Sequence, residues 1–169
     1  MRIPICAFDA KTGILCAKCE GKLRSGHISK SDVDASARFV NFADKHPQLG
    51  GLSLHRAYDV NGSTVLVLGS TDLISIRREP LLKTKLEEVF GKKVWLLEGD
   101  SSDRKILEDL VFPVKILTVN QVWLPDGSRL TKAIISGRKT ERFPVDLDEV
   151  KSVVKRVKGI DLLVEFERA

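Results

Sequence analysis

The three cysteines of this 169-residue chain all lie in one short segment near its start. Cys16 and Cys19 form a C-x-x-C motif, and Cys6 precedes it with Asp9 three positions further on. Two turns of the form C-x-x-X, a few residues apart, can gather four ligands around one tetrahedral zinc ion. The pattern C-x-x-D-x(6)-C-x-x-C therefore predicts a structural zinc site in which a carboxylate replaces one thiolate.

Two alternatives to this ligand set remain open at the level of the sequence. His27 follows Cys19 closely, and an imidazole is a more usual fourth zinc ligand than a carboxylate. The segment is otherwise a degenerate motif, with three cysteines in a small packed turn and no metal. Disulfides are not favoured, because the cysteines are odd in number and clustered at one end.

The sequence contains no other group of residues that points to catalysis. The three histidines are scattered, and there is no H-E-x-x-H helix, G-x-S-x-G elbow or G-x-x-x-x-G-K phosphate loop. The deaminase pattern of H-x-E with P-C-x-x-C is also absent. We therefore expect a protein that is not an enzyme, and a metalloenzyme is the weaker alternative that zinc removal would test.

The composition is that of a soluble, moderately basic protein. Lys and Arg number 28 against 23 for Asp and Glu, which gives a net charge of +5. This surplus favours a polyanionic partner without requiring one. Trp95 and Trp123 lie in predicted strands among aliphatic residues, so we expect both to pack in a core. No apolar run approaches the roughly 18 residues that cross a bilayer, so we expect a cytoplasmic protein with no membrane partner.

The hydrophobic pattern of the middle of the chain predicts helices and strands in alternation. Asn61-Gly62 suits the positive φ angles of a tight hairpin turn, so it joins two strands. A short helix from residue 72 ends near Arg77 or Arg78, because Pro80 cannot continue it. Gly91 ends the next helix. The predicted elements are a helix at 31–46, strands at 52–60 and 64–69, the short helix, a helix at 81–90 and a strand at 93–97.

The rest of the chain repeats this order in abbreviated form, which is typical of a tandem duplication. A loop, GRKTERFPVD, occupies the place of the short helix. The predicted elements are a helix at 102–111, strands at 114–124 and 129–136, a helix at 146–158 and a strand at 160–166. The predicted domains are therefore 1–28, 29–99 and 100–169.

The element order α-β-β-α-α-β resembles that of a type II KH domain, and two such units in tandem resemble the KH region of NusA. The stretch LVLGSTDLISIRREPLLKTKLEEVFGKKVWLLEG is similar to a KH core in detail. Counting back from its FGKKV turn places the GxxG positions at Arg77-Arg78-Glu79-Pro80. With its cysteine-rich start, the chain resembles an archaeal NusA-like tandem KH-domain protein with an N-terminal zinc-knuckle segment. In such relatives we expect a second C-x-x-C where this chain has Asp9.

This resemblance implies an α+β fold with three parts. They are a cysteine-rich, zinc-knuckle-like segment (1–28), a first KH-like domain with a degenerate GxxG loop (29–99) and a second that lacks GxxG (100–169). In a KH domain the two glycines let the protein backbone approach about four nucleotides of single-stranded RNA. Here Arg77 and Pro80 replace both glycines, so we expect a contact that depends on charge. The expected RNA-binding residues are Arg77, Arg78, Lys83 and Lys85, and in the second unit Arg138, Lys139 and Arg142.

The resemblance further implies RNA binding in transcription elongation or termination, or in a ribosome-associated process. RNA polymerase and ribosome components are the partners that it suggests. The alternative for the basic residues is an ordinary solvated surface, the commoner fate of such charges. In that case the protein would be an interaction adaptor whose KH-like units have lost their RNA loops and dock on RNA polymerase or a ribonucleoprotein. The missing glycines and the modest net charge support this alternative, and RNA binding stays the leading expectation.

Overall fold

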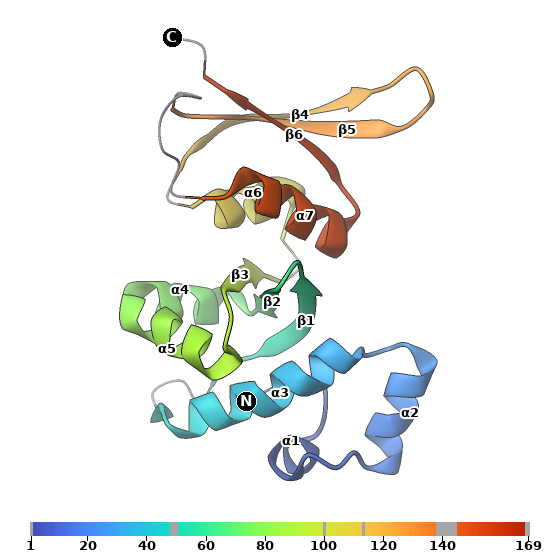
Figure 1. Cartoon of the computed structure of the whole chain (residues 1–169), viewed down its shortest axis with the longest axis vertical. Coiled ribbons are helices and arrows are strands. Elements are labelled where there is room, and N and C mark those ends of the chain that lie inside the picture. The colour runs from blue at the N-terminus through green and yellow to red at the C-terminus, as the bar shows by residue number, and fades with distance from the viewer. Residues whose placement is uncertain (1, 48–50, 100, 113, 138–144, 168–169) are drawn as a thin grey trace. The chain divides into compact units, whose positions relative to one another are not determined.

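The computed structural model describes the chain apart from residues 1, 48–50, 100, 113, 138–144 and 168–169. The chain divides into two compact units, Met1–Gly99 and Asp100–Ala169, and each contains helices and one three-stranded sheet (Figure 1). Residues 1–28 belong to the first unit and do not form a separate one. In the part of the chain that is described, no helix has the length and apolar character needed to cross a membrane.

The first unit contains every element predicted for it and two helices that were not predicted. Its sheet has the order β1-β2-β3, with β1 and β2 antiparallel and β2 and β3 parallel. From α3 onward the order is the expected α-β-β-α-α-β. The elements are α1 (Ala7–Thr12), α2 (Ala17–Ser25), α3 (Lys30–Asp44), β1 (Leu54–Val60), β2 (Ser63–Leu68), α4 (Ser70–Arg78), α5 (Pro80–Phe90) and β3 (Val94–Glu98).

Glycine and proline set the element boundaries that position the expected site. Asn61 and Gly62 have φ of 47° and 80°, the positive values that a tight hairpin between β1 and β2 requires. Pro80 is the first residue of α5, where a missing N–H costs nothing. Glu79 is then the single residue between α4 and α5. The α4–α5 pair is therefore a tight helical hairpin, not two helices separated by an open loop.

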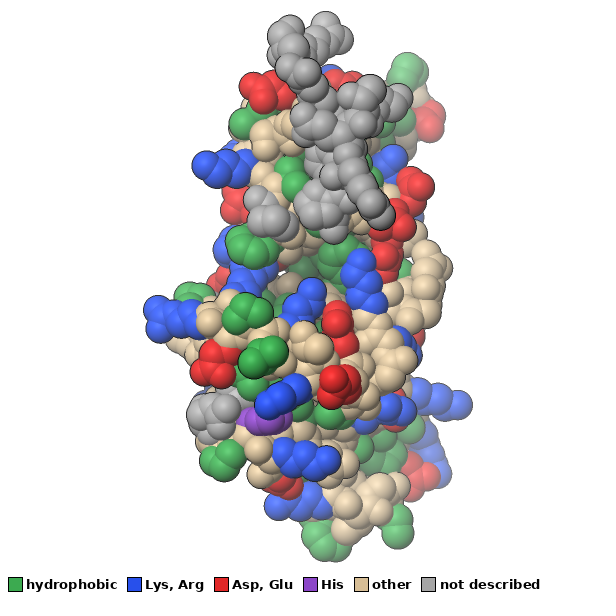
Figure 2. All heavy atoms as spheres, turned by 60° about the vertical axis from the view of Figure 1, so that its left-hand side comes forward, with side chains coloured by type: hydrophobic (Ala, Val, Ile, Leu, Met, Phe, Trp, Pro, Cys, Tyr) green, Lys and Arg blue, Asp and Glu red, His purple; other side chains and the backbone are tan. Residues whose placement is uncertain are grey.

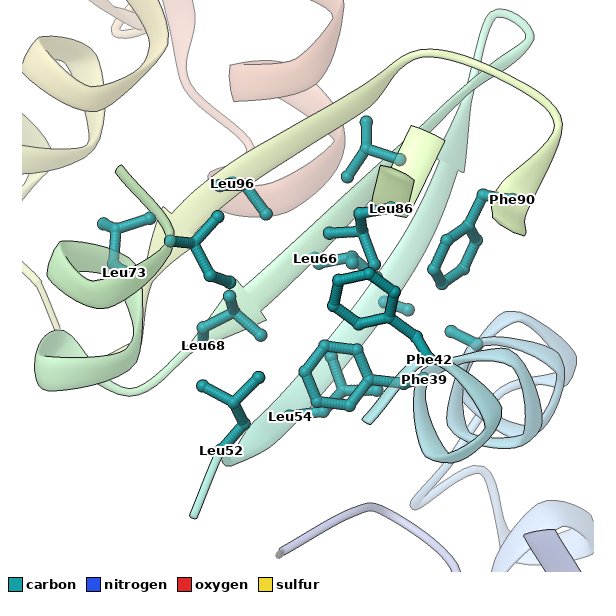
Figure 3. Packing of buried hydrophobic residues seen from close by; sticks show 14 of the residues in the cluster. Phe39, Phe42, Leu52, Leu54, Leu66, Leu68, Leu73, Leu86, Phe90 and Leu96 are labelled. Atoms are coloured by element: carbon teal, nitrogen blue, oxygen red, sulfur yellow. The ribbon is translucent and has the colours of Figure 1, made fainter. Parts of the chain in front are cut away.

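The core of the first unit lies between its helices and one face of its sheet (Figure 3). Phe39 and Phe42 of α3 pack against apolar side chains of the central strand and of α5. All of these side chains are buried. Loss of a buried phenylalanine typically costs about 3–5 kcal/mol, so this cluster fixes how α3 and the α4–α5 pair lie on the sheet.

The second unit has the same sheet topology, and among the residues described it has two helices where the first unit has three from α3 onward. Its order is β4-β5-β6, with β4 and β5 antiparallel and β5 and β6 parallel. The predicted valine stripe of the second helix is buried at Val150, Val153 and Val154. The elements are α6 (Asp103–Val111), β4 (Ile116–Trp123), β5 (Arg129–Ile135), α7 (Leu147–Lys158) and β6 (Asp161–Phe166).

The two tryptophans differ in their surroundings. Trp95 in β3 is 8% exposed, as predicted for a core residue. The same prediction was wrong for Trp123, which is 70% exposed at the end of β4. The β4–β5 hairpin extends beyond the helices of its unit (Figure 1), and every residue from Asn120 to Arg129 is exposed. The strand itself was predicted correctly. In the described part of the chain, however, no apolar core covers the hairpin from Asn120 to Arg129.

Candidate metal centre and nucleic-acid interface

The N-terminal ends of α1 and α2 bring together the four residues of the C-x-x-D and C-x-x-C turns. Cys6 and Cys16 are the N-cap residues of the two helices, and Asp9 and Cys19 lie in their first turns. The sequence spacing thus becomes two similar helix starts that face each other. One potential ligand atom from each of these residues lies within 4.8 Å of the others, and the group is Cys6, Asp9, Cys16 and Cys19.

Backbone hydrogen bonds connect the two turns. The Cys16 N–H donates to Asp9 Oδ2 at 2.9 Å, and the Cys6 N–H donates to Cys19 Sγ at 3.5 Å. Asp9 is only 2% exposed, yet its Oδ1 has no hydrogen-bond partner. An unpaired buried polar group costs about 1–3 kcal/mol, and a bound cation would remove that cost. This oxygen is the strongest single sign that the group holds a metal.

Protonation within the group follows from the same contacts. The hydrogen bond from the Cys16 backbone N–H to Oδ2, followed by the nearby Cys19 thiol, holds the pKa of the Asp9 carboxyl well below its usual range, so the carboxylate is charged. The Cys6 backbone N–H lowers the pKa of the Cys19 thiol, but burial and Asp9 outweigh it and raise that pKa to about 12. A bound metal cation favours the thiolate form and would therefore lower the pKa of the Cys19 thiol.

The geometry is close to what zinc requires. Zinc–sulfur bonds of about 2.3 Å at tetrahedral angles place ligand atoms about 3.8 Å apart. The 4.8 Å limit of the group is therefore compatible with zinc after a small contraction. Three thiolates with one carboxylate are a donor set that suits zinc better than magnesium or calcium, which prefer oxygen ligands only.

Apolar packing and backbone hydrogen bonds also hold this segment. Ile5, Ala10 and Cys19 form a small apolar cluster with Ile28 and with Val40 of α3. The backbone of Arg2 also bonds to the start of β1, since its N–H donates to Leu52 O and its carbonyl accepts from Leu54 N. The segment therefore packs on the first unit. Its apolar side chains are buried against α3 at Val40.

His27 does not lie with the other candidate ligands. It is exposed just after the end of α2, and its Nδ1 lies 2.7 Å from Ser25 Oγ. Gly26, with φ of 81°, ends the helix between these two residues. The alternative ligand set with His27 is therefore not supported, and Asp9 is the residue that completes the group.

The expected GxxG positions coincide with the α4–α5 junction. Arg77 and Arg78 form the last turn of α4, Arg78 and Glu79 are exposed, and Pro80 opens α5. Arg77 is half-buried, so Arg78 is the more accessible of the two cations. Two guanidinium groups therefore occupy a helical corner of the first unit.

Of the other expected RNA-binding residues, the structure describes Lys83 and Lys85, which do not share one side of α5. Lys83 and Lys85 are both exposed on α5, but residues two positions apart point to different sides of a helix. Lys83 Nζ also lies 4.0 Å from Glu87 Oε1. Figure 2 shows Lys and Arg side chains among acidic and hydrophobic ones, not a continuous basic patch. Arg138, Lys139 and Arg142 lie outside the described residues.

Two exposed apolar residues on α4 and α5 were not predicted. Ile74 of α4 and Leu81 of α5 are both exposed, and Leu81 is 73% exposed. The sequence does contain a signal for Leu81, since the buried residues of α5 are Leu82, Leu86 and Phe90 and it lies off that stripe. For Ile74 no comparable signal exists, because α4 is too short to show a periodicity.

Comparison with known proteins gives a fold and no family. No protein-family model and no curated protein matches the chain. A solved structure titled "Crystal structure of APE1850" is similar, with a TM-score of 0.50 and 16% sequence identity. The match covers 76% of this chain and 96% of that one. The matched part of this chain is longer than the first unit, so residues of both units are included in the similarity. At this sequence identity, the similarity concerns the fold alone.

Proposed function

We propose that this protein binds single-stranded RNA through two KH-like units in tandem, like the archaeal NusA-like proteins that it resembles. The observation that carries the proposal is the position of Arg77 and Arg78. They lie at the corner between the paired helices of an α-β-β-α-α-β unit, where a KH domain has its GxxG loop. The resemblance also suggests the setting, namely the cytoplasm and transcription elongation or termination, or a ribosome-associated process. RNA polymerase or ribosome components are the corresponding partners.

The proposed contact depends on phosphate charge and not on close backbone approach. Each guanidinium can hold a phosphate by two parallel hydrogen bonds, and Arg78 is exposed enough to do so. Pro80 has no N–H to offer, and the junction contains no glycine. Affinity should therefore fall steeply with salt. For single strands the expected slope is about −0.7 per phosphate contact in log K against log salt.

The test is a charge reversal at the junction. Arg77→Glu with Arg78→Glu should weaken binding of a single-stranded RNA at least tenfold and make the salt slope shallower by about 1.4, since two phosphate contacts are lost. The matched control is Lys151→Glu with Lys158→Glu, which changes the net charge equally on α7. Filter-binding titrations from low to high salt report both values. No measurable RNA affinity of the unaltered protein at any salt concentration would refute the proposal.

We also propose that the group of Cys6, Asp9, Cys16 and Cys19 holds one structural zinc ion, with Asp9 bound through Oδ1. The unpaired, buried Oδ1 supports this assignment. Asp9→Ala should abolish stoichiometric zinc in the purified protein, whereas Asp9→Cys should retain it. Cobalt substitution separates the two donor sets, because the thiolate-to-cobalt absorption should increase from three thiolates to four in Asp9→Cys. Equal zinc content in Asp9→Ala and the unaltered protein would remove Asp9 from the ligand set.

Ile74 and Leu81 favour a second candidate function, that of a protein-interaction adaptor. Exposed apolar side chains on α4 and α5 are typical of a surface that contacts another protein. Two double variants distinguish these functions. If the protein binds RNA, Arg77→Glu with Arg78→Glu should remove RNA binding and leave a protein complex intact. If the protein is an interaction adaptor, Ile74→Ser with Leu81→Ser should dissociate the complex and leave RNA binding unchanged.

A further inference from the structure

β4 is an edge strand that lacks the features by which proteins usually protect a sheet edge. Natural edge strands carry charged residues, proline or a bulge that twists them away. The other edge strands of the two described sheets contain such charges, for example Asp59 in β1, Glu98 in β3 and Glu165 in β6. Among these strands β4, with the sequence ILTVNQVW, is the one without an acidic or basic residue. Its register shift lies at its very start, between Ile116 and Thr118.

The backbone groups that face this open edge can be identified from the hairpin turn. The Leu124 N–H donates to Ser128 O at 2.9 Å, so residues 124 and 128 are a hydrogen-bonded pair. Hydrogen-bonded and non-hydrogen-bonded pairs alternate along an antiparallel ladder. From Thr118 to the end of β4, the even-numbered residues therefore bond to β5. The N–H and C=O groups of Val119, Gln121 and Trp123 point away from β5, toward the edge.

We propose that β4 of one chain pairs antiparallel with β4 of a second copy, which joins two three-stranded sheets into one six-stranded sheet. Antiparallel pairing of a strand with itself is a two-fold, isologous contact, so the same surface serves both copies. A second copy is favoured over another partner because the strand is uncharged throughout, and no like charges meet when it faces itself. This inference does not depend on RNA or zinc binding.

The alternation of backbone groups limits the possible registers. The backbone groups of Val119, Gln121 and Trp123 pair with no other strand in the described part of the chain, so these residues must face odd-numbered residues of the second copy. A two-fold axis at Asn120 satisfies this condition and uses the whole strand. It places Val119 opposite Gln121, and it brings Trp123 beside Leu117 of the second copy. Trp123 and Leu117 are 70% and 44% exposed, so the contact would cover apolar surface at both ends.

The same register makes a charge test possible. Thr118 lies opposite Val122 of the second copy, and both side chains are exposed, so the variants should fold. Thr118→Lys with Val122→Lys brings like charges together twice, and so does Thr118→Glu with Val122→Glu. Each variant alone should be monomeric by sedimentation at high protein concentration. An equimolar mixture should form a dimer, as should the unaltered protein, with twice the 18.8 kDa mass of one chain.

Hydrogen exchange tests whether the dimer forms through pairing of the two β4 strands. The amides of Val119, Gln121 and Trp123 should exchange more slowly in the unaltered protein than in either monomeric variant, and at equal rates in the two variants. Several results would each overturn the proposal. They are a monomeric unaltered protein, variants that dimerise alone, a mixture that stays monomeric, and dimerisation without protection of these amides. A monomeric protein in which Trp123→Ala weakens RNA binding would assign the edge to RNA instead, and would also overturn it.

Discussion

The sheets of the two units have the same strand order and directions, but the helix before each sheet begins in a different way. In the first unit, Ser29 and Asp32 form a capping box at the start of α3. Asp32 is fully buried, and its Oδ1 also accepts a hydrogen bond from the Ala57 N–H of β1 at 2.7 Å. In the second unit, Ser102 accepts a hydrogen bond from Lys105 N, and a lysine stands where the first unit has Asp32.

This difference shows that one topology can be fixed by different means. The first unit connects its leading helix to its sheet through a buried carboxylate, and a cysteine-containing segment packs on the same helix. The second unit depends more on the apolar contacts of α6 and α7, and half of its first hairpin is exposed on both faces. The first unit therefore contains the four possible metal ligands and the two arginines of the proposed phosphate contact. The second offers an exposed strand edge.

Removal of the proposed zinc ion should have the largest effect, and this effect should be confined to the first unit. A metal present at 100 times its dissociation constant stabilises the folded form by about 2.7 kcal/mol, and tighter binding adds more. A chelator should therefore raise amide exchange in α1 and α2 at least about 100-fold. Exchange in α6 and α7 should not change. Hydrogen exchange of the whole chain before and after chelation measures both units at once.

His27 provides the control for metal removal. His27→Ala should leave both the zinc content and the exchange of α1 and α2 unchanged, because the residue is exposed and lies outside the group. Cys19→Ser should reproduce the effect of the chelator. Unchanged exchange in α1 and α2 after chelation would mean that the apolar cluster alone holds the segment.

The two helix starts should differ in how much they contribute to stability. Asp32→Ala leaves the N–H groups of Ser29 and Ala57 without their partner, and each loss costs about 1–3 kcal/mol. Ser102→Ala removes one cap and should cost about 1 kcal/mol. Urea unfolding of the full chain, followed by amide signals from each unit, gives the two free energies of unfolding. Similar losses in the two variants would contradict the buried connection between α3 and β1.

Local signals in the sequence were sufficient for most of the elements of both units. Asn61-Gly62, Pro80 and Gly91 each impose a backbone conformation that few alternatives satisfy, so the adjoining helices and strands were predicted nearly in full. The cysteine spacing likewise predicted which four residues come together. The assignment of the units as KH-like domains stays a prediction, since element order alone does not define a family.

The features that the sequence did not predict depend on tertiary contacts. α1 and α2 are short, and such helices are marginal on their own, so their stability comes from packing against Val40 of α3. The burial of Asp9 has no sequence signature, because it depends on how the two turns face each other. Trp123 lies in a strand whose pattern is the same whether or not a core lies beneath it.

Trp123→Ala should have the smallest effect on stability. The side chain is mostly exposed, and its only ring contact among the described residues is the Arg129 guanidinium, 6.0 Å from the ring centroid. An exposed cation–π contact contributes about 0.5–1 kcal/mol, so the free energy of unfolding should fall by no more than that. A loss of about 3 kcal/mol, as for a core aromatic, would show that the hairpin packs on something in the folded chain. Association should respond differently, because Trp123 lies at the end of the proposed strand pair. A Trp123→Ala variant that unfolds like the unaltered protein but no longer dimerises would show that Trp123 contributes to association and not to the folding of the hairpin.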